Sequence, residues 1–154
     1  MRKAKVGRTT DRMYVVTRRS NTPKPFKAPE SVCADILKIG RLQSVSRGSI
    51  LFHKGDPPQG LFLILEGRVA LSAGDDPVRV TRVAENGSLL GLPSTIRNLP
   101  YTLTAEAVTH VDVCWVSASQ FREMLASNTE LGLTVVTMLA EEISALRKLA
   151  VYKA

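Results

Sequence analysis

The chain has 154 residues, of which 44% are hydrophobic and 23% are charged, and it carries a net charge of +7. This length suits a single domain with a working hydrophobic core and leaves no room for a second domain. The longest unbroken apolar run, Leu61 to Leu65, is far too short to cross a bilayer, and two cysteines cannot form a disulfide framework.

The positive charge is concentrated at the amino terminus. Residues 1–29 contain nine Lys or Arg and one acidic residue, whereas the remainder contains twelve basic and thirteen acidic residues. Asn21 to Pro25 offer little apolar surface to offset the cost of ordering, so residues 1–27 are predicted to form a flexible basic arm. A basic arm can attract nucleic acid, an anionic membrane or an acidic partner, or only aid solubility. Of these we expect weak nucleic-acid binding and no membrane binding. An organelle transit peptide would share this composition, but the arm lacks a clear amphipathic period, so we expect a cytoplasmic protein.

Residues 28–154 are predicted to form one domain that begins with a helix. Pro29 suits the first turn, Val32 and Ile36 share one face, and Gly40 ends the helix. Short apolar stretches separated by turns follow at roughly ten-residue spacing, which is typical of a β-roll or β-sandwich. The predicted strands are 42–46, 49–52, 61–65, 68–72, 78–83, 102–108 and 111–116, within a roll over about residues 41–116.

The most specific pattern lies between Gly48 and Leu71. A Gly-Asp-Pro-Pro turn at residues 55–58 leads into Leu61 to Leu65, which is apolar on both faces and suits a strand buried on two sides. Gly67 then supplies the positive φ of a tight hairpin. This segment resembles the cyclic-nucleotide-binding domain of the Crp/Fnr type, and the resemblance covers most of the chain. It implies a mainly β fold, a jelly-roll-like β-roll with flanking helices and a long C-terminal dimerisation helix.

The carboxyl-terminal part changes to a 3.6-residue apolar period, which predicts helices at about 118–126 and 128–151. Ser117 with Gln120 and Ser127 with Glu130 each fit a capping box. The second helix carries an apolar stripe at spacings of three and four, and this stripe could pack on the chain's own sheet. The resemblance favours a parallel coiled coil instead, and therefore a homodimer. The stripe consists of Gly132, Val136, Leu139, Ile143, Leu146 and Ala150.

The resemblance also identifies a cassette for the cyclic phosphate at residues 87–103. Gly91 matches the cassette glycine and Thr102 stands where Ser or Thr is usual. Leu92, however, occupies the position of the glutamate that holds the ribose hydroxyl, and Tyr101 occupies that of the phosphate-binding arginine. A buried phosphate needs compensating charge, and a ribose hydroxyl beside leucine has no acceptor. We therefore do not expect ordinary cyclic AMP binding.

One alternative source of positive charge lies inside the cassette. Arg97 could swing toward the backbone amides of Ser94 and Thr95, which by the resemblance start a one-turn helix and form an anion nest. Arg97 could equally be a solvated loop residue. The sequence leaves both readings open.

The remaining chemistry-bearing residues form no recognisable site. A cupin would need clustered histidines, and the chain has only His53 and His110. Cys33 and Cys114 are predicted to be reduced thiols, without the spacing of a metal pair, and they are too few for an iron–sulfur cluster. Nor does the sequence contain a nucleophile–base pair or a phosphate-binding glycine loop, so we expect no enzymatic activity and no metal or cofactor.

These features predict a ligand-sensing effector module that binds a small molecule other than cyclic AMP, or none. The alternatives are a true cyclic-nucleotide-binding domain that uses Arg97, or a pure interaction protein whose pocket is filled by Leu92 and Tyr101. Crp/Fnr regulators continue into a helix-turn-helix domain, whereas this sequence stops at Ala154. It is therefore expected to be a stand-alone effector domain, a remnant that pairs with a partner, or a piece of a longer regulator.

Overall fold

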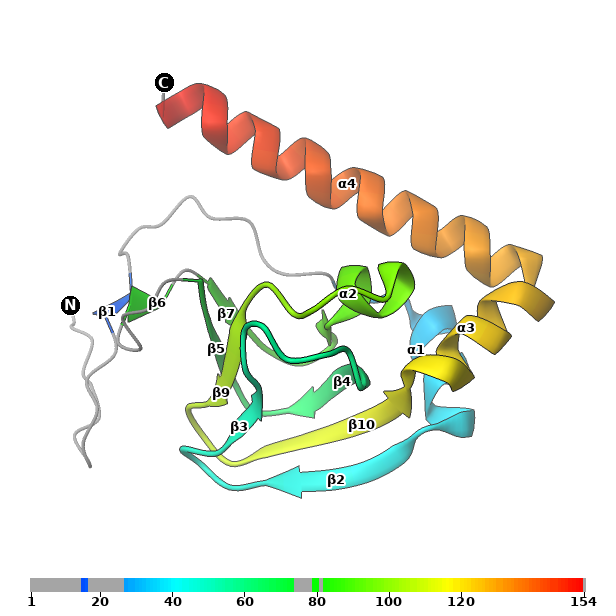
Figure 1. The fold of residues 1–154 in the computed structure, drawn as a ribbon, viewed down its shortest axis with the longest axis horizontal. Helices are drawn as coiled ribbons and strands as arrows, with labels where there is room; N and C mark the ends of the chain where they lie inside the picture. The colour runs from blue at the N-terminus through cyan, green and yellow to red at the C-terminus, as the bar shows by residue number, and fades with distance from the viewer. Residues whose placement is uncertain (1–14, 17–26, 74–78, 81, 154) are drawn as a thin grey trace.

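The computed structural model describes residues 15–16, 27–73, 79–80 and 82–153, so most of the predicted arm lies outside the described residues. The described chain contains two four-stranded antiparallel sheets followed by two C-terminal helices, which confirms the predicted β-roll (Figure 1). The first sheet has the strand order β2-β10-β4-β8 and consists of Arg41–Val45, Val111–Ser117, Gly60–Glu66 and Leu89–Leu90. The second has the order β3-β9-β5-β7 and consists of Ile50–Phe52, Thr104–Ala107, Val69–Ser72 and Arg82–Ala84.

Strand β4 is buried on both faces, as its sequence predicts. Phe62 and Ile64 face the interior between the two sheets, where they join a cluster from both sheets that includes Val69 and Ala105. Leu61 and Leu63 belong to a second cluster, the helix-side core. This strand therefore separates the two hydrophobic cores of the domain.

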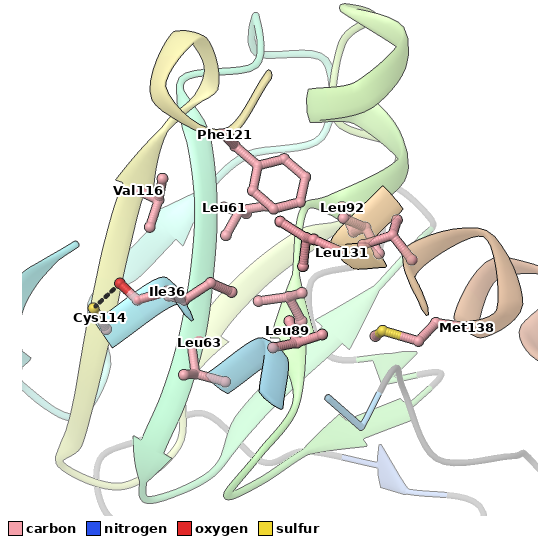
Figure 2. Packing of buried hydrophobic residues seen from close by; sticks show 12 residues of the cluster. Ile36, Leu61, Leu63, Leu89, Leu92, Cys114, Val116, Phe121, Leu131 and Met138 are labelled. Atoms are coloured by element: carbon pink, nitrogen blue, oxygen red, sulfur yellow. Dashed lines mark hydrogen bonds between the residues drawn. The ribbon is translucent and has the colours of Figure 1, made fainter. Parts of the chain in front are cut away.

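The helix-side core lies between the first sheet and four helices, α1 (Glu30–Ile39), α2 (Leu92–Arg97), α3 (Ala118–Ser127) and α4 (Thr129–Lys153). Figure 2 shows its members directed toward one another from these elements, with Phe121 of α3 close to Leu61 of β4. Cys114 lies at its edge, and its Sγ donates to the Ile36 carbonyl oxygen over 3.7 Å. A Cβ at Gly40 would lie 2.3 Å from this sulfur, so close packing, and not a positive φ, requires glycine where α1 ends.

The starts of the two C-terminal helices differ from each other. The predicted capping box at α3 is confirmed, because the Ser117 side chain accepts from the Gln120 amide and the Gln120 side chain binds back. The predicted box at Ser127 is wrong. Its hydroxyl donates back into α3 to the Glu123 carbonyl oxygen, and the side-chain oxygen of Asn128 accepts from the backbone of α4 instead.

Two short β contacts involve residues of the predicted arm. Within it, β1 (Val15–Val16) pairs in parallel with β6 (Arg79–Val80). Lys27 forms an antiparallel bridge with Ser88, and its ammonium donates to the Asn86 carbonyl oxygen. Two adjacent β-branched valines favour a strand at this position.

Candidate functional site

A cavity of about 610 Å³ lies where the resemblance places the cassette. Its walls come from the second sheet, from β8, from the short helix α2 (Leu92–Arg97) and from α4. Figure 1 shows α4 running from α3 past α2. The polar side chains of the wall are Arg82, Ser94, Arg97, Thr102 and Glu142, and the rest of the lining is mainly apolar. The position therefore holds an open cavity and is not filled by its own side chains.

Gly91 allows the cassette backbone to approach β4. It precedes α2 with a φ of 87°, in the left-handed region that favours glycine. A Cβ at this position would lie 3.1 Å from both the Gly60 carbonyl oxygen and the Cε1 of Tyr101. The positive φ and the close approach to β4 thus explain why glycine occupies this position.

Leu92 does not face the cavity. Its side chain is fully buried in the helix-side core, near Leu131 of α4 (Figure 2). The position that the resemblance assigns to a ribose-binding carboxylate therefore anchors α2 to the helices. No acceptor reaches the cavity from Leu92.

Tyr101 is buried with its hydroxyl fully engaged. The hydroxyl donates to the Gly60 carbonyl oxygen at 2.7 Å and accepts from the amides of Gln59 and Gly60 at 3.0 and 3.1 Å. Its ring stacks on Phe52 with 4.0 Å between centroids and lines the cavity. Tyr101 thus offers a ligand an aromatic surface and no charge.

Of the two backbone amides of the predicted anion nest, that of Thr95 is already used within the chain, and the nest stays a prediction. The Thr95 amide donates to the Gly91 carbonyl oxygen at 3.0 Å, so the first turn of α2 already uses it. The Ser94 hydroxyl donates to the Pro100 carbonyl oxygen at 3.2 Å. Thr95 itself is buried away from the cavity, and the guanidinium of Arg122 caps its carbonyl oxygen at 2.9 Å.

Arg97 and Thr102 lie at the rim of the cavity. Both residues are exposed and both line the wall. Of the predicted cassette residues, the structure therefore brings Gly91, Ser94, Arg97, Tyr101 and Thr102 together around one space. Leu92 and Thr95 are not part of that wall.

The cavity wall contains an ion pair that the sequence pattern does not predict. The Arg82 Nη2 of β7 lies 2.6 Å from Glu142 Oε2 of α4, and the two side chains are 13% and 12% exposed. Arg82 falls in a predicted strand and Glu142 in a predicted helix, and neither belongs to a recognisable motif. Their proximity depends on how α4 lies against the roll, which the sequence pattern does not specify.

The predicted dimer stripe divides between two environments. Leu131, Val135 and Met138 form the buried face of α4, whereas Val136 and Ile143 are 61% and 52% exposed. Leu139 is half-buried against the helix-side core and also lines the cavity. Leu133, outside the predicted stripe, is 63% exposed. The side chains of Leu146 and Ala150 lie outside the described residues.

Neither cysteine forms a disulfide bond, and burial raises the pKa of each thiol above its usual value. Nearby Glu30 adds to the increase in the pKa of Cys33. A raised pKa disfavours the thiolate, which is the form that binds metals and reacts. His110 contacts Asp112 at 3.2 Å on the surface. Within the described ranges, no group of three His, Cys, Asp or Glu residues could hold a metal ion, and no helix is long and apolar enough to cross a membrane.

Comparisons with known proteins agree with this architecture. A curated relative, the cyclic nucleotide-gated potassium channel RHE_CH03180 of Rhizobium etli, is 27% identical over 109 residues, which cover 71% of this chain and 30% of the channel. A putative cyclic nucleotide-binding protein of Geobacter metallireducens is 27% identical, with a TM-score of 0.61, over 76% of this chain and 86% of that structure.

A second solved structure is more similar in shape and less similar in sequence. The catabolite activator protein of Thermus thermophilus has a TM-score of 0.69 at 18% identity, over 81% of this chain and 60% of that one. The cyclic nucleotide-binding domain profile matches residues 42–128, more than half of the chain. The chain therefore belongs to the cyclic nucleotide-binding domain family.

Proposed function

We propose that this domain is a non-enzymatic regulatory module of the Crp/Fnr effector type that senses a small molecule other than cyclic AMP or cyclic GMP. The proposal rests on the two positions that the resemblance assigns to the ribose-binding glutamate and the phosphate-binding arginine, which are Leu92 and Tyr101 in this chain. Leu92 is packed into the helix-side core, and the Tyr101 hydroxyl is engaged by the backbone of Gln59 and Gly60. The cavity nevertheless remains open beside them.

The two missing anchors have a large effect on affinity. A charge-assisted hydrogen bond contributes about 1.5–3 kcal/mol, and tenfold in affinity corresponds to about 1.4 kcal/mol. Loss of both the ribose carboxylate and the phosphate arginine weakens a micromolar cyclic nucleotide by several hundredfold or more. The mainly apolar wall favours a less polar ligand.

Regulation follows from the elements that share the cavity. Ser94 of α2 and both Leu139 and Ile143 of α4 line it, so a bound molecule contacts the cassette and the long helix together. A ligand that prefers one arrangement of these helices shifts the population toward that arrangement. The exposed Val136 and Ile143 support a homodimer through α4, in which this shift reaches a second copy.

Calorimetry with cyclic AMP and cyclic GMP tests the proposal. We expect dissociation constants no better than about 1 mM, and a low-micromolar constant for either nucleotide would overturn the proposal. The second candidate function, true cyclic-nucleotide binding, is favoured by the place of Arg97 in the cavity wall. If this second function is correct, Arg97→Ala abolishes the low-micromolar binding of the nucleotide. The control variant Arg41→Ala, whose guanidinium stacks on Trp115 outside the cavity, retains it.

A further inference from the structure

The Arg82–Glu142 ion pair is an unusual feature for a ligand cavity. Both residues line the cavity, both side chains are nearly buried, and they join the roll to the long helix. Arg82 belongs to strand β7. It therefore lies outside residues 87–103, the segment in which the resemblance places the phosphate-binding arginine. This inference rests on the proposed function, because it specifies the ligand of the same cavity.

Arg82 has hydrogen-bonding capacity that Glu142 does not use. Its Nη2 meets one carboxylate oxygen at 2.6 Å, while its Nε is buried and has no hydrogen-bond partner within the described part of the chain. A guanidinium is a planar fork that binds a carboxylate or a similar oxyanion best through two parallel hydrogen bonds. The buried Nε therefore indicates a missing acceptor.

The rest of the cavity fits an apolar body attached to that acceptor. Hydrophobic side chains such as Leu71, Leu90, Ile96 and Leu103 line it, and its volume of about 610 Å³ lies within the usual range for small-ligand pockets. Arg82 and Arg97 contribute two positive charges to the wall, whereas Glu142 contributes one negative charge. An added anion would balance these charges.

We propose that Arg82 anchors an organic anion with an apolar body, such as a carboxylate or sulfonate on an aromatic or aliphatic skeleton. Glu142 is the internal carboxylate that occupies the guanidinium until the ligand displaces it. Because Glu142 belongs to α4, its displacement removes an ion pair between this helix and the roll. Anion binding thereby becomes coupled to the position of α4.

Two fluorescent probes of closely similar shape test this proposal. Anilinonaphthalene sulfonate carries an anionic sulfonate on an aromatic body, and N-phenylnaphthylamine has the same body without the charge. Titrations of the full chain at physiological salt should give saturable one-to-one binding of the sulfonate probe. The sulfonate should bind roughly tenfold more tightly than the neutral probe, because its oxygens pair with Arg82.

Three variants identify the groups responsible. Arg82→Gln should weaken the sulfonate probe by about tenfold or more and leave the neutral probe within about twofold. Glu142→Gln should tighten the sulfonate by roughly fivefold or more, because it removes the competing carboxylate. Glu141→Gln is the matched control, since this neighbouring glutamate is exposed and does not line the cavity; it should leave both constants unchanged.

The outcomes separate this inference from the proposed function. Equal affinity for the two probes, or weaker sulfonate binding in Glu142→Gln, would overturn the anion site while leaving a small-molecule cavity. Binding of neither probe would overturn both proposals. Far-ultraviolet circular dichroism and retained neutral-probe binding show whether Arg82→Gln is folded. If it is not, the Glu142→Gln result decides alone.

Discussion

Replacement of Tyr101 by phenylalanine removes one oxygen atom that binds three backbone groups. In the parent chain that hydroxyl serves the carbonyl and amide of Gly60 and the amide of Gln59, at 2.7–3.1 Å. Phenylalanine keeps the ring and its stacking on Phe52, whose centroid lies 4.0 Å away. The change therefore isolates the hydrogen bonds from the packing.

The expected loss can be worked from burial. Each buried polar group left without a partner costs about 1–3 kcal/mol. Gln59 is exposed, so water can reach its amide, whereas Gly60 is buried and contributes two groups. We expect Tyr101→Phe to lower the free energy of unfolding by about 2–6 kcal/mol.

Urea unfolding followed by circular dichroism measures this loss. The midpoint should fall while the dependence of free energy on urea stays unchanged, because the surface exposed on unfolding is the same. Thr102→Ala, at the exposed neighbouring residue, should stay within about 0.5 kcal/mol of the parent. A loss below about 0.5 kcal/mol in Tyr101→Phe would refute the view that this hydroxyl fastens the cassette to β4.

Three further predictions concern the helix, the thiols and the arm. Ile143→Glu should convert a dimer into a monomer in sedimentation experiments, because it buries an unpaired charge in each copy. The control variant Ser144→Glu should remain a dimer. A monomeric parent protein at tens of micromolar would contradict the dimer. Because burial raises the pKa of Cys114, the folded state retains its proton to higher pH. The contribution of this thiol to the free energy of unfolding should therefore be constant below about pH 9 and fall above it. Thermal melts check this, and Cys114→Ser should remove that part of the fall. Removal of residues 1–27 should abolish any non-specific DNA binding, which in the parent should weaken steeply with salt. Retained sequence-selective binding would contradict a role for the arm.

The elements with a strong local pattern could be predicted from the sequence. Strand β4 is apolar on both faces because it lies between two cores, and this environment is visible in Leu61 to Leu65 without any tertiary information. The α3 start carries an unambiguous capping box at Ser117. The start of α4 is harder, because Ser127 and Asn128 are adjacent and both are good capping residues. Only the direction of the Ser127 hydroxyl, back into α3, decides between them.

The position of the cassette in the chain could be predicted from the sequence, but the arrangement of its side chains could not. The absence of a carboxylate at Leu92 is visible in the sequence, whereas the burial of this side chain under the helices depends on how α2 packs. Arg82 and Glu142 are far apart in the chain, and no spacing rule joins a strand residue to a helix residue at that distance. Their ion pair exists because α4 passes the open side of the roll.

The long helix contributes to three environments, and this arrangement connects the cavity to the surface. Met138 is buried in the helix-side core, Leu139 contacts both that core and the cavity, and Val136 is exposed. A helix is rigid over such a short distance, so a ligand that moves Leu139 must also move both Met138 and Val136. Displacement of Met138 would disturb close packing, which is costly. Under the proposed function, ligand binding must therefore supply the free energy that shifts Met138 in its core, and the same movement of α4 carries the exposed apolar face with it.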